Sequence, residues 1–273
     1  MAGLRASAKG FARSYAQRTK DLQELAWSSS EGLSPDAVHD LRVATRRVQM
    51  LCRLLPRDSR RSEEYERLDA AVSSLLKATS RVRDFDTLTL TLETWKASLP
   101  PALFSTLANE RANALRGVKA TVEAVSGALP PTFDFSLIDS KKLSRRLRRR
   151  VERRSNVVLG LLDTVMSDES RIEELHALRK ETKKLRYLLE LADKSPRELP
   201  VLTAWQERLG AIHDLDVAVD CIRRSQLDFP KQKAIAELMR RRHLGYRRFG
   251  RECGRDSARV LKASAFLAPR ATA

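Results

Sequence analysis

The sequence contains few of the residues that break helices or cross-link a chain. Its 273 residues include 10 glycines, 10 prolines and 3 cysteines, and aromatic residues make up 5% of the total. Scarce glycine and proline argue against many short strands joined by tight turns. Alanine, leucine, arginine and glutamate are abundant instead, and these residues favour long helices. We therefore predict an all-α protein.

The cysteines exclude a disulfide-stapled miniprotein. Cys52, Cys221 and Cys253 are odd in number and far apart, and they form no C-x-x-C pair. A disulfide framework or a cysteine-based metal centre needs paired cysteines at short, regular spacing. We expect free thiols, buried and in a reducing cytoplasm, with no metal and no other cofactor.

Long apolar runs are also missing. No stretch approaches the run of about 20 apolar residues that spans a bilayer, so we expect no membrane association. Residues 1–20 are basic, with no acidic residue before Asp21, which is the composition of a transit peptide. The internal repeat described below assigns this segment to the first helix of the fold instead, and the expected location is the cytoplasm.

Charge is strongly one-sided. The chain has 52 basic and 35 acidic residues, a net charge of +17, and 42% of its residues are hydrophobic, enough for a globular core. Such a surface attracts anions. Residues 1–137 hold 20 basic and 16 acidic residues, whereas residues 138–273 hold 32 and 19. The second half is therefore predicted to dominate the electrostatic field.

The chain contains an internal repeat, because residues 38–55 align with residues 175–192. The aligned pairs are His39 with His176, Arg42 with Arg179, Thr45 with Thr182, and Arg46-Arg47 with Lys183-Lys184. Further along, Val82–Asp86 aligns with Ile212–Asp216 in the same order. Two related segments in one order indicate a duplicated unit. We predict a first half at 1–130 and a second half at 137–273, joined through the Pro130–Asp134 linker.

Helix-capping residues and prolines predict four helices in each half. The expected helices of the first half are Leu4–Trp27, Pro35–Leu55 after the cap Ser34, Ser62–Ser98, and Pro101–Gly127. Those of the second half are Ser140–Met166, Arg171–Ala192 after the capping box Ser170/Glu173, Pro196–Ser225 after the box Ser195/Glu198, and Pro230–Phe266. Four helices close around a core as a bundle. Two facing bundles would leave a groove or pore between them.

The repeated segment is an amphipathic helix with a basic face. At about 100° per residue, His39, Arg42 and Arg46 fall on one side, opposite a stripe of leucine and valine. The second copy places His176, Arg179, Lys183 and Arg186 on the matching side. A row of cations repels itself unless an anion lies along it. A polyphosphate or nucleic-acid backbone would supply that anion, and the alternative is a solvated basic face.

Two acidic pairs follow the basic helices, Asp84/Asp86 and Asp214/Asp216. Two carboxylates at positions i and i+2 would suit Mg²⁺, but on a helix they diverge and no third ligand recurs beside them. We therefore expect one aspartate of each pair to hydrogen-bond a cation of the basic row and fix its rotamer.

These paired motifs resemble the CHAD family, the conserved histidine α-helical domains. The resemblance rests on His39-x-x-Arg42-x-x-x-Arg46-Arg47, His176-x-x-Arg179-x-x-x-Lys183-Lys184, Arg83-Asp84-x-Asp86 and His213-Asp214-x-Asp216, and it covers nearly the whole chain. It implies two pseudo-symmetric four-helix halves around a basic pore that binds inorganic polyphosphate, association with polyphosphate granules, and contact with other granule proteins. One departure is Ala211, whose counterpart in the first half is Arg81.

The resemblance and the repeat together select the candidate ligand contacts. The expected polyphosphate-binding residues are His39, Arg42, Arg46, Arg47, His176, Arg179, Lys183, Lys184 and Arg186. Weaker candidates are Lys9, Arg13, Arg53, Arg81, Arg83, Arg146 and Arg149. Asp84, Asp86, Asp214 and Asp216 are expected to orient them.

Other functions are weighed against this one. The His39-Asp40 and His213-Asp214 dipeptides mimic those of metal-dependent phosphohydrolases, but they fall at non-equivalent positions of the repeat and the chain has only 4 histidines. No catalytic motif is visible, so we expect a binding protein and not an enzyme. Nucleic-acid binding is the main alternative, because residues 240–249 interleave arginines with Tyr246 and Phe249. Their helical spacing predicts core contacts for these two rings instead. An adaptor that recruits proteins to granules is a third possibility.

Overall fold

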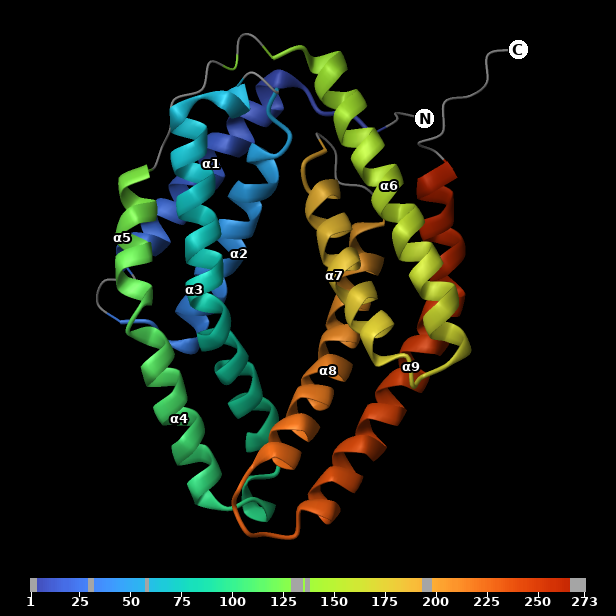
Figure 1. Ribbon diagram of the computed structural model, residues 1–273. Coiled ribbons are helices and arrows are strands. Elements are labelled where there is room, and N and C mark those ends of the chain that lie inside the picture. The colour runs from blue at the N-terminus through green and yellow to red at the C-terminus, as the bar shows by residue number, and fades with distance from the viewer. Residues whose placement is uncertain are drawn as a thin grey trace. The chain divides into compact units, whose positions relative to one another are not determined.

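The protein is all-α, as predicted. A computed structural model describes residues 4–28, 32–56, 59–128, 135, 138–192 and 198–265, and the side chains of all of these except Ser59 and residues 255–265. These residues form nine α-helices and contain no strand (Figure 1). Among them, no helix is both long and apolar enough to cross a bilayer.

The chain divides into two compact units. The N-terminal unit is Ser7–Leu143, and the C-terminal unit is Ser144–Ala273 together with Met1–Ala6. The division falls after the first turn of helix α6 (Ser140–Ser167). The predicted linker, residues 130–134, lies outside the described residues.

In the N-terminal unit, the central helix is α3 (Glu63–Glu93). It packs against α2 (Pro35–Cys52), α4 (Pro101–Leu115) and α5 (Val118–Ala128), and α1 (Ala8–Ser28) packs against α2 and α5. Short 3-10 turns at Ser59–Arg61 and Lys96–Ser98 flank α3. Residues that are fully buried form one face of each long helix, including Leu22, Leu41, Val48, Leu68 and Leu75. The apolar stripes predicted from helical spacing thus form the core.

Local capping fixes where these helices begin. The Ser34 side chain accepts a hydrogen bond from the Ala37 amide at 3.2 Å, so α2 begins at Pro35 as predicted. Ser62 caps α3 in the same way. The first helix begins at Ala8 instead of Leu4, because the Ser7 hydroxyl accepts from the Gly10 amide at 3.0 Å.

One predicted helix is two helices. We expected a single helix over Pro101–Gly127, but α4 ends at Leu115 and α5 begins at Val118. The Arg116 amide bonds Asn113 at 3.3 Å in a tighter turn, and Gly117 follows. The chain changes direction there (Figure 1), which allows α5 to pack against α1 as well as α3. The described residues of the N-terminal unit therefore form five α-helices before α6, where four were predicted.

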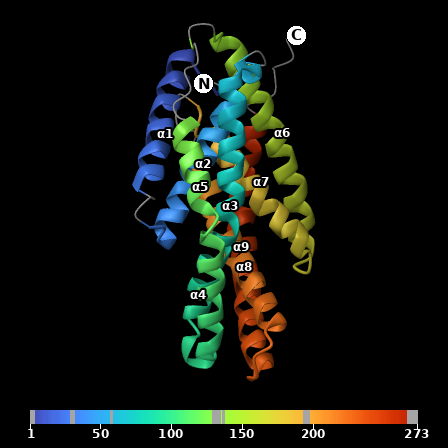
Figure 2. The same ribbon diagram turned by 60° about the vertical axis from the view of Figure 1, so that its left-hand side comes forward.

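In the C-terminal unit, α8 (Leu199–Arg224) packs against both α7 (Ile172–Leu189) and α9 (Lys231–Ala265) (Figure 2). The indole of Trp205 in α8 meets the ring of Phe249 in α9 edge-on, with 6.2 Å between ring centroids. Both residues are almost fully buried. Helix α6 is buried along Leu143, Leu147 and Val151 and is basic on its other side.

The capping box predicted for α7 does not form. The Ser170 amide and hydroxyl both bond the carboxylate of Asp168, at 2.8 and 2.9 Å, and the helix begins at Ile172 without a side-chain cap. An aspartate two residues upstream competes locally for the donors of Ser170. Glu198 precedes α8 without a side-chain cap, and Ser195 of the second predicted box lies outside the described residues.

The cysteines carry free thiols, as predicted. Cys52 and Cys253 are buried, but Cys221 is partly exposed. Burial raises the pKa of the Cys52 thiol to about 12.

Candidate anion-binding site

Helix α2 carries its predicted basic residues on the side away from its core. Val38, Leu41 and Val48 are fully buried. His39 is exposed, and Arg42, Arg46 and Arg47 are half-buried, with Arg53 exposed just beyond the helix end. This face therefore combines partial solvent access with contact to neighbouring helices.

Arg42 of α2 is held in place by hydrogen bonds to α3. Its Nη1 donates to the carbonyl of Leu76 and to the hydroxyl of Thr79, both at 2.8 Å and both in α3. The Thr79 hydroxyl donates in turn to the Leu75 carbonyl at 2.6 Å. These bonds set the position of the guanidinium.

The weaker candidates of the N-terminal unit are mostly exposed. Arg81 pairs with Glu110 at 3.4 Å and lies over the ring of Phe85. Arg83 is half-buried, and Lys9 and Arg13 are exposed on α1. The Arg81 side chain is 73% exposed and that of Glu110 is 45% exposed, so this pair is a weak electrostatic contact.

Asp86 bonds a cation outside the basic row. Its Oδ1 accepts from Nε of Arg111 in α4, whereas the partner expected for one aspartate of each pair was a cation of that row. The Nη2 of Arg111 also donates to the Leu33 carbonyl, immediately before α2, at 2.7 Å. The Asp86 side chain is only 1% exposed, and among the described residues its Oδ2 has no hydrogen-bond partner. Its neighbour Asp84 is exposed.

Helix α7 repeats the amphipathic arrangement in the C-terminal unit. Leu175, Leu178 and Leu185 are buried. The predicted contacts of this copy are all half-buried: His176, Arg179, Lys183, Lys184 and Arg186. Arg179 crosses α8 at Gly210, where an added Cβ would lie 3.9 Å from the Arg179 Nε.

Two cations of this row are paired with acids, which the sequence analysis did not predict. Glu181 accepts from Lys184 at 2.7 Å and from Arg154 of α6. Burial would raise the pKa of Glu181, but these two hydrogen bonds outweigh it and hold the pKa below its usual value. Lys184 therefore has an acidic partner within its own unit, which helical spacing alone did not reveal.

Arg186 is likewise held within its own unit. It pairs with Glu190, donates to Gln206 at 2.9 Å, and lies 4.5 Å from the ring centroid of Tyr187. Its side chain is only 15% exposed. These contacts indicate that Arg186 stabilises its own unit more than it serves ligand binding.

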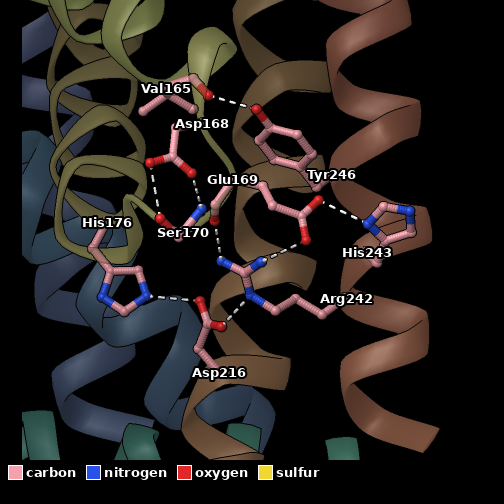
Figure 3. A network of polar contacts seen from close by, with 9 residues as sticks. All are labelled: Val165, Asp168, Glu169, Ser170, His176, Asp216, Arg242, His243 and Tyr246. Atoms are coloured by element: carbon pink, nitrogen blue, oxygen red, sulfur yellow. Dashed lines mark hydrogen bonds and ion pairs between the residues drawn. The ribbon is translucent and has the colours of Figure 1, made fainter. Parts of the chain in front are cut away.

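His176 lies at the centre of a polar network (Figure 3). Its Nε2 is 3.1 Å from Oδ2 of Asp216, and its ring lies 4.4 Å from that of His213, centroid to centroid. His213 in turn lies 3.3 Å from Asp214. Desolvation lowers the pKa of His176 below its ordinary value, against the raising effect of the Asp216 hydrogen bond, and the adjacent His213 lowers it further.

Arg242 is a functional candidate that the sequence analysis missed. Its Nε bonds Oδ1 of Asp216 at 2.5 Å, and its Nη2 donates to the Glu169 carbonyl at 3.0 Å (Figure 3). The Glu169 carboxylate accepts from His243 at 2.8 Å. Arg242 therefore ties α9 to α8 and to the turn that precedes α7.

The same arginine contact occurs in each unit. Arg111 and Arg242 each bond an aspartate of the helix that follows the histidine helix, and each bonds a backbone carbonyl just before the histidine helix. Asp86 and Arg111 are 25 residues apart, and Asp216 and Arg242 are 26 apart. The two spacings differ by one residue, and a spacing of 25 from Asp216 would have selected Arg241, so the sequence alone did not identify Arg242.

The segment that suggested nucleic-acid stacking is structural. Phe249 is fully buried, and the Tyr246 hydroxyl donates to the Val165 carbonyl at 2.6 Å. Arg240 and Arg241 both pair with Glu237. The prediction of a core contact is confirmed for Phe249, whereas Tyr246 is half-buried.

On α6, Arg149 is exposed and Arg146 is half-buried. Among the described residues, no group of three His, Cys, Asp or Glu side chains is suited to a metal ion.

The comparisons with known proteins agree with this architecture. A model of the CHAD domain matches residues 13–223. The fold is similar to that of the CHAD domain from the plant Ricinus communis, with a TM-score of 0.56, 20% identity, and coverage of 99% of this chain and 95% of that one. It is also similar to PptA from Streptomyces chartreusis, with a TM-score of 0.57, 15% identity and coverage of 94% and 99%. No curated protein matches the chain. Because the family match spans well over half of the residues, the chain belongs to the CHAD domain family.

Proposed function

We propose that this protein binds inorganic polyphosphate, without catalysis, along the basic faces of α2 and α7. The observation that carries the proposal is that donors on these faces are held in place by groups behind them. Arg42 is anchored by the Leu76 carbonyl and Thr79, and His176 is anchored by Asp216. Anchored donors lose little conformational entropy when an anion arrives.

The chemistry of the ligand fits this arrangement. Polyphosphate presents charged oxygens at short, regular intervals and has no bases to be read. Arginine offers a planar fork to two such oxygens, and lysine offers a flexible point charge. From His176 to Lys183 the α7 face extends about 10 Å at 1.5 Å per residue, which is long enough for several phosphates. Family membership and the net charge of +17 support the same ligand.

A nucleic-acid backbone would satisfy the cations equally, but it would leave the bases without partners. Base stacking contributes about 1–3 kcal/mol per base where aromatic rings are exposed. In the described segment 240–249 the Phe249 ring is buried and the Tyr246 hydroxyl is bonded. We therefore place nucleic acid second. Cytoplasmic polyphosphate granules, with other granule proteins as partners, are the location this ligand implies.

Competition binding tests the proposal. Long-chain polyphosphate is measured against single-stranded and duplex nucleic acid at about 0.15 M salt, where non-specific phosphate binding is already weakened. We expect polyphosphate to bind at least tenfold more tightly. Equal competition by nucleic acid would instead identify a generic polyanion-binding protein.

Matched charge variants locate the site. Arg42→Gln combined with Arg179→Gln removes one cation from each basic face. Arg67→Gln combined with Arg224→Gln removes the same charge from exposed ion pairs elsewhere, one in each unit. We expect the first pair alone to weaken binding strongly. Equal loss in both would show that net charge, and not the basic faces, determines affinity.

A further inference from the structure

The two ring nitrogens of His176 have different environments. Nε2 is bonded to Asp216 at 3.1 Å, whereas Nδ1 points away from that carboxylate (Figure 3). Within the described part of the chain, no group hydrogen-bonds Nδ1. The side chain is 26% exposed. One nitrogen is therefore used by the protein, and the other makes no hydrogen bond within the described residues.

The orientation of this ring depends on Arg242. The Asp216 side chain is 9% exposed and that of Arg242 is 3% exposed. Arg242 bonds Oδ1 of Asp216, which leaves Oδ2 for His176. It is itself fixed by the Glu169 carbonyl. A carboxylate behind a histidine sets which nitrogen carries the proton and where the ring points.

This arrangement determines when His176 can bind phosphate. An ionised Asp216 accepts a hydrogen bond, so Nε2 must carry a proton. In the neutral ring, Nδ1 then has only a lone pair, which repels a phosphate oxygen. Only the imidazolium form donates to Asp216 and to phosphate at once. Binding at Nδ1 therefore requires uptake of one proton from solvent.

Burial, together with nearby cations, lowers the pKa of His176 and favours the neutral ring in the free protein. From α8, the His213 ring packs against His176 at a tilt with Asp214 beside it, and Asp216 bonds His176; Lys180 is a further cation on α7 itself. Arg242 of α9 and the Glu169 turn act through Asp216. Burial and His213 together lower the pKa of His176 despite Asp216. A bound phosphate would add the negative charge that favours protonation.

We propose that Arg242 and Asp216 are positioning residues that present Nδ1 of His176 to bound polyphosphate, so that binding is coupled to proton uptake at this ring. This inference rests on the proposed function. It applies to the C-terminal unit. In the N-terminal unit the residue aligned with His213 is Arg83, a permanent cation, and Oδ2 of Asp86 has no hydrogen-bond partner.

Two measurements on the full chain test the proposal. Nitrogen-15 NMR of the 4 histidines, assigned by single His→Gln variants, reports the tautomer of each ring with and without polyphosphate. Calorimetry in buffers of different ionisation enthalpy reports protons taken up on binding. We expect the Nε2–H tautomer in the free protein and a doubly protonated His176 ring in the complex. Affinity should fall as pH rises above the pKa of free His176, by up to about tenfold per pH unit for one proton.

Asp216→Asn is the decisive variant. Its side-chain oxygen still accepts from Arg242, but its amide donates to Nε2, which reverses the tautomer of His176. Neutral His176 then carries a proton on Nδ1 and donates it to phosphate. We expect binding at pH 8 to be kept and the proton uptake at His176 to vanish. Arg242→Gln should instead leave a mixture of tautomers.

The matched control is Asp86→Asn, which alters the corresponding arginine contact without touching His176. It should leave the tautomer and the proton uptake of the wild type unchanged. An Nδ1–H tautomer in the free protein, or equal proton uptake in wild type and Asp216→Asn, would overturn the positioning role while leaving polyphosphate binding intact. If the wild type does not bind polyphosphate, both the proposed function and the proton coupling are overturned. The tautomer of His176 in the free protein would still test whether Asp216 orients the ring.

Discussion

The Nε of Arg242 lies 2.5 Å from Oδ1 of Asp216, and both side chains are at least nine-tenths buried. A charge in such a position is stable only while its partner remains. In the N-terminal unit, Arg111 and Asp86 are joined by the equivalent contact. Each unit therefore has an ion pair with a buried aspartate that joins two of its helices. The same arginine also bonds the backbone just before the histidine helix.

Removing one partner of the Arg242–Asp216 pair should lower the free energy of unfolding. Arg242→Met leaves Asp216 without its cation, and we expect a loss of about 3–5 kcal/mol in the free energy of unfolding. Urea unfolding followed by circular dichroism measures it. Arg81→Met serves as the comparison, because the exposed Arg81–Glu110 pair should contribute less than about 1 kcal/mol.

The double variant Arg242→Met with Asp216→Leu tests whether the cost comes from the unpaired charge. Apolar replacement of both partners of a buried pair is often neutral. We expect it to be much more stable than Arg242→Met alone. If the double variant is as unstable as the single one, the loss comes from packing and not from the charge.

Stability at low pH should depend on Glu181. The pKa of this carboxylate lies below its ordinary value of 4.5 in the folded protein, where Lys184 and Arg154 donate to it. A lowered folded pKa adds stability above pH 4.5, and this stability is lost as pH falls through the folded pKa. Glu181→Gln should thus be less stable than wild type at pH 7, with the difference in Tm narrowing towards pH 3. A difference that stays constant with pH would show that ionisation of Glu181 contributes nothing.

Binding of polyphosphate should weaken steeply with salt. On nucleic acids, each neutralised phosphate contributes about 0.7–0.9 to the slope of log affinity against log salt. Arg179→Gln should reduce the magnitude of this slope by about 1, as expected for loss of one phosphate contact, whereas Arg224→Gln should not change it. Fluorescence titrations from about 0.05 to 0.3 M salt are sufficient. A flat response in the wild type would contradict a site built from rows of cations.

The helical faces could be predicted from the sequence because they depend on local periodicity. Positions 175, 178, 182 and 185 share one face of the helix, and Leu175, Leu178, Thr182 and Leu185 are buried accordingly. The position of His176 and Arg179 on the partly exposed side follows from the same spacing. The start of α2 at Pro35 depends only on Ser34 and its neighbours, and it was likewise predictable.

The partners of the site residues could not be read from that periodicity, because they come from other helices. Arg111 reaches Asp86 from α4, and Arg154 reaches Glu181 from α6. A helical projection shows the face on which a side chain lies, but it does not show which acid a neighbouring helix brings to it. The missed cap at Ser170 has a local cause, since Asp168 competes for the same donors.

Arg179 and Arg186 should respond in opposite ways to the same substitution. Arg186 is bonded to Glu190 and Gln206 and stacks on Tyr187, so Arg186→Gln removes internal contacts and should lower Tm. Arg179 crosses α8 at Gly210 and makes no ion pair within the described residues. Arg179→Gln should therefore leave Tm nearly unchanged but weaken polyphosphate binding by several-fold, with charge loss equal in the two variants. Thermal unfolding and binding titrations on both proteins separate the two roles. If Arg186→Gln weakened binding as much as Arg179→Gln without lowering Tm, Arg186 would be a ligand contact, as its place in the sequence repeat first suggested.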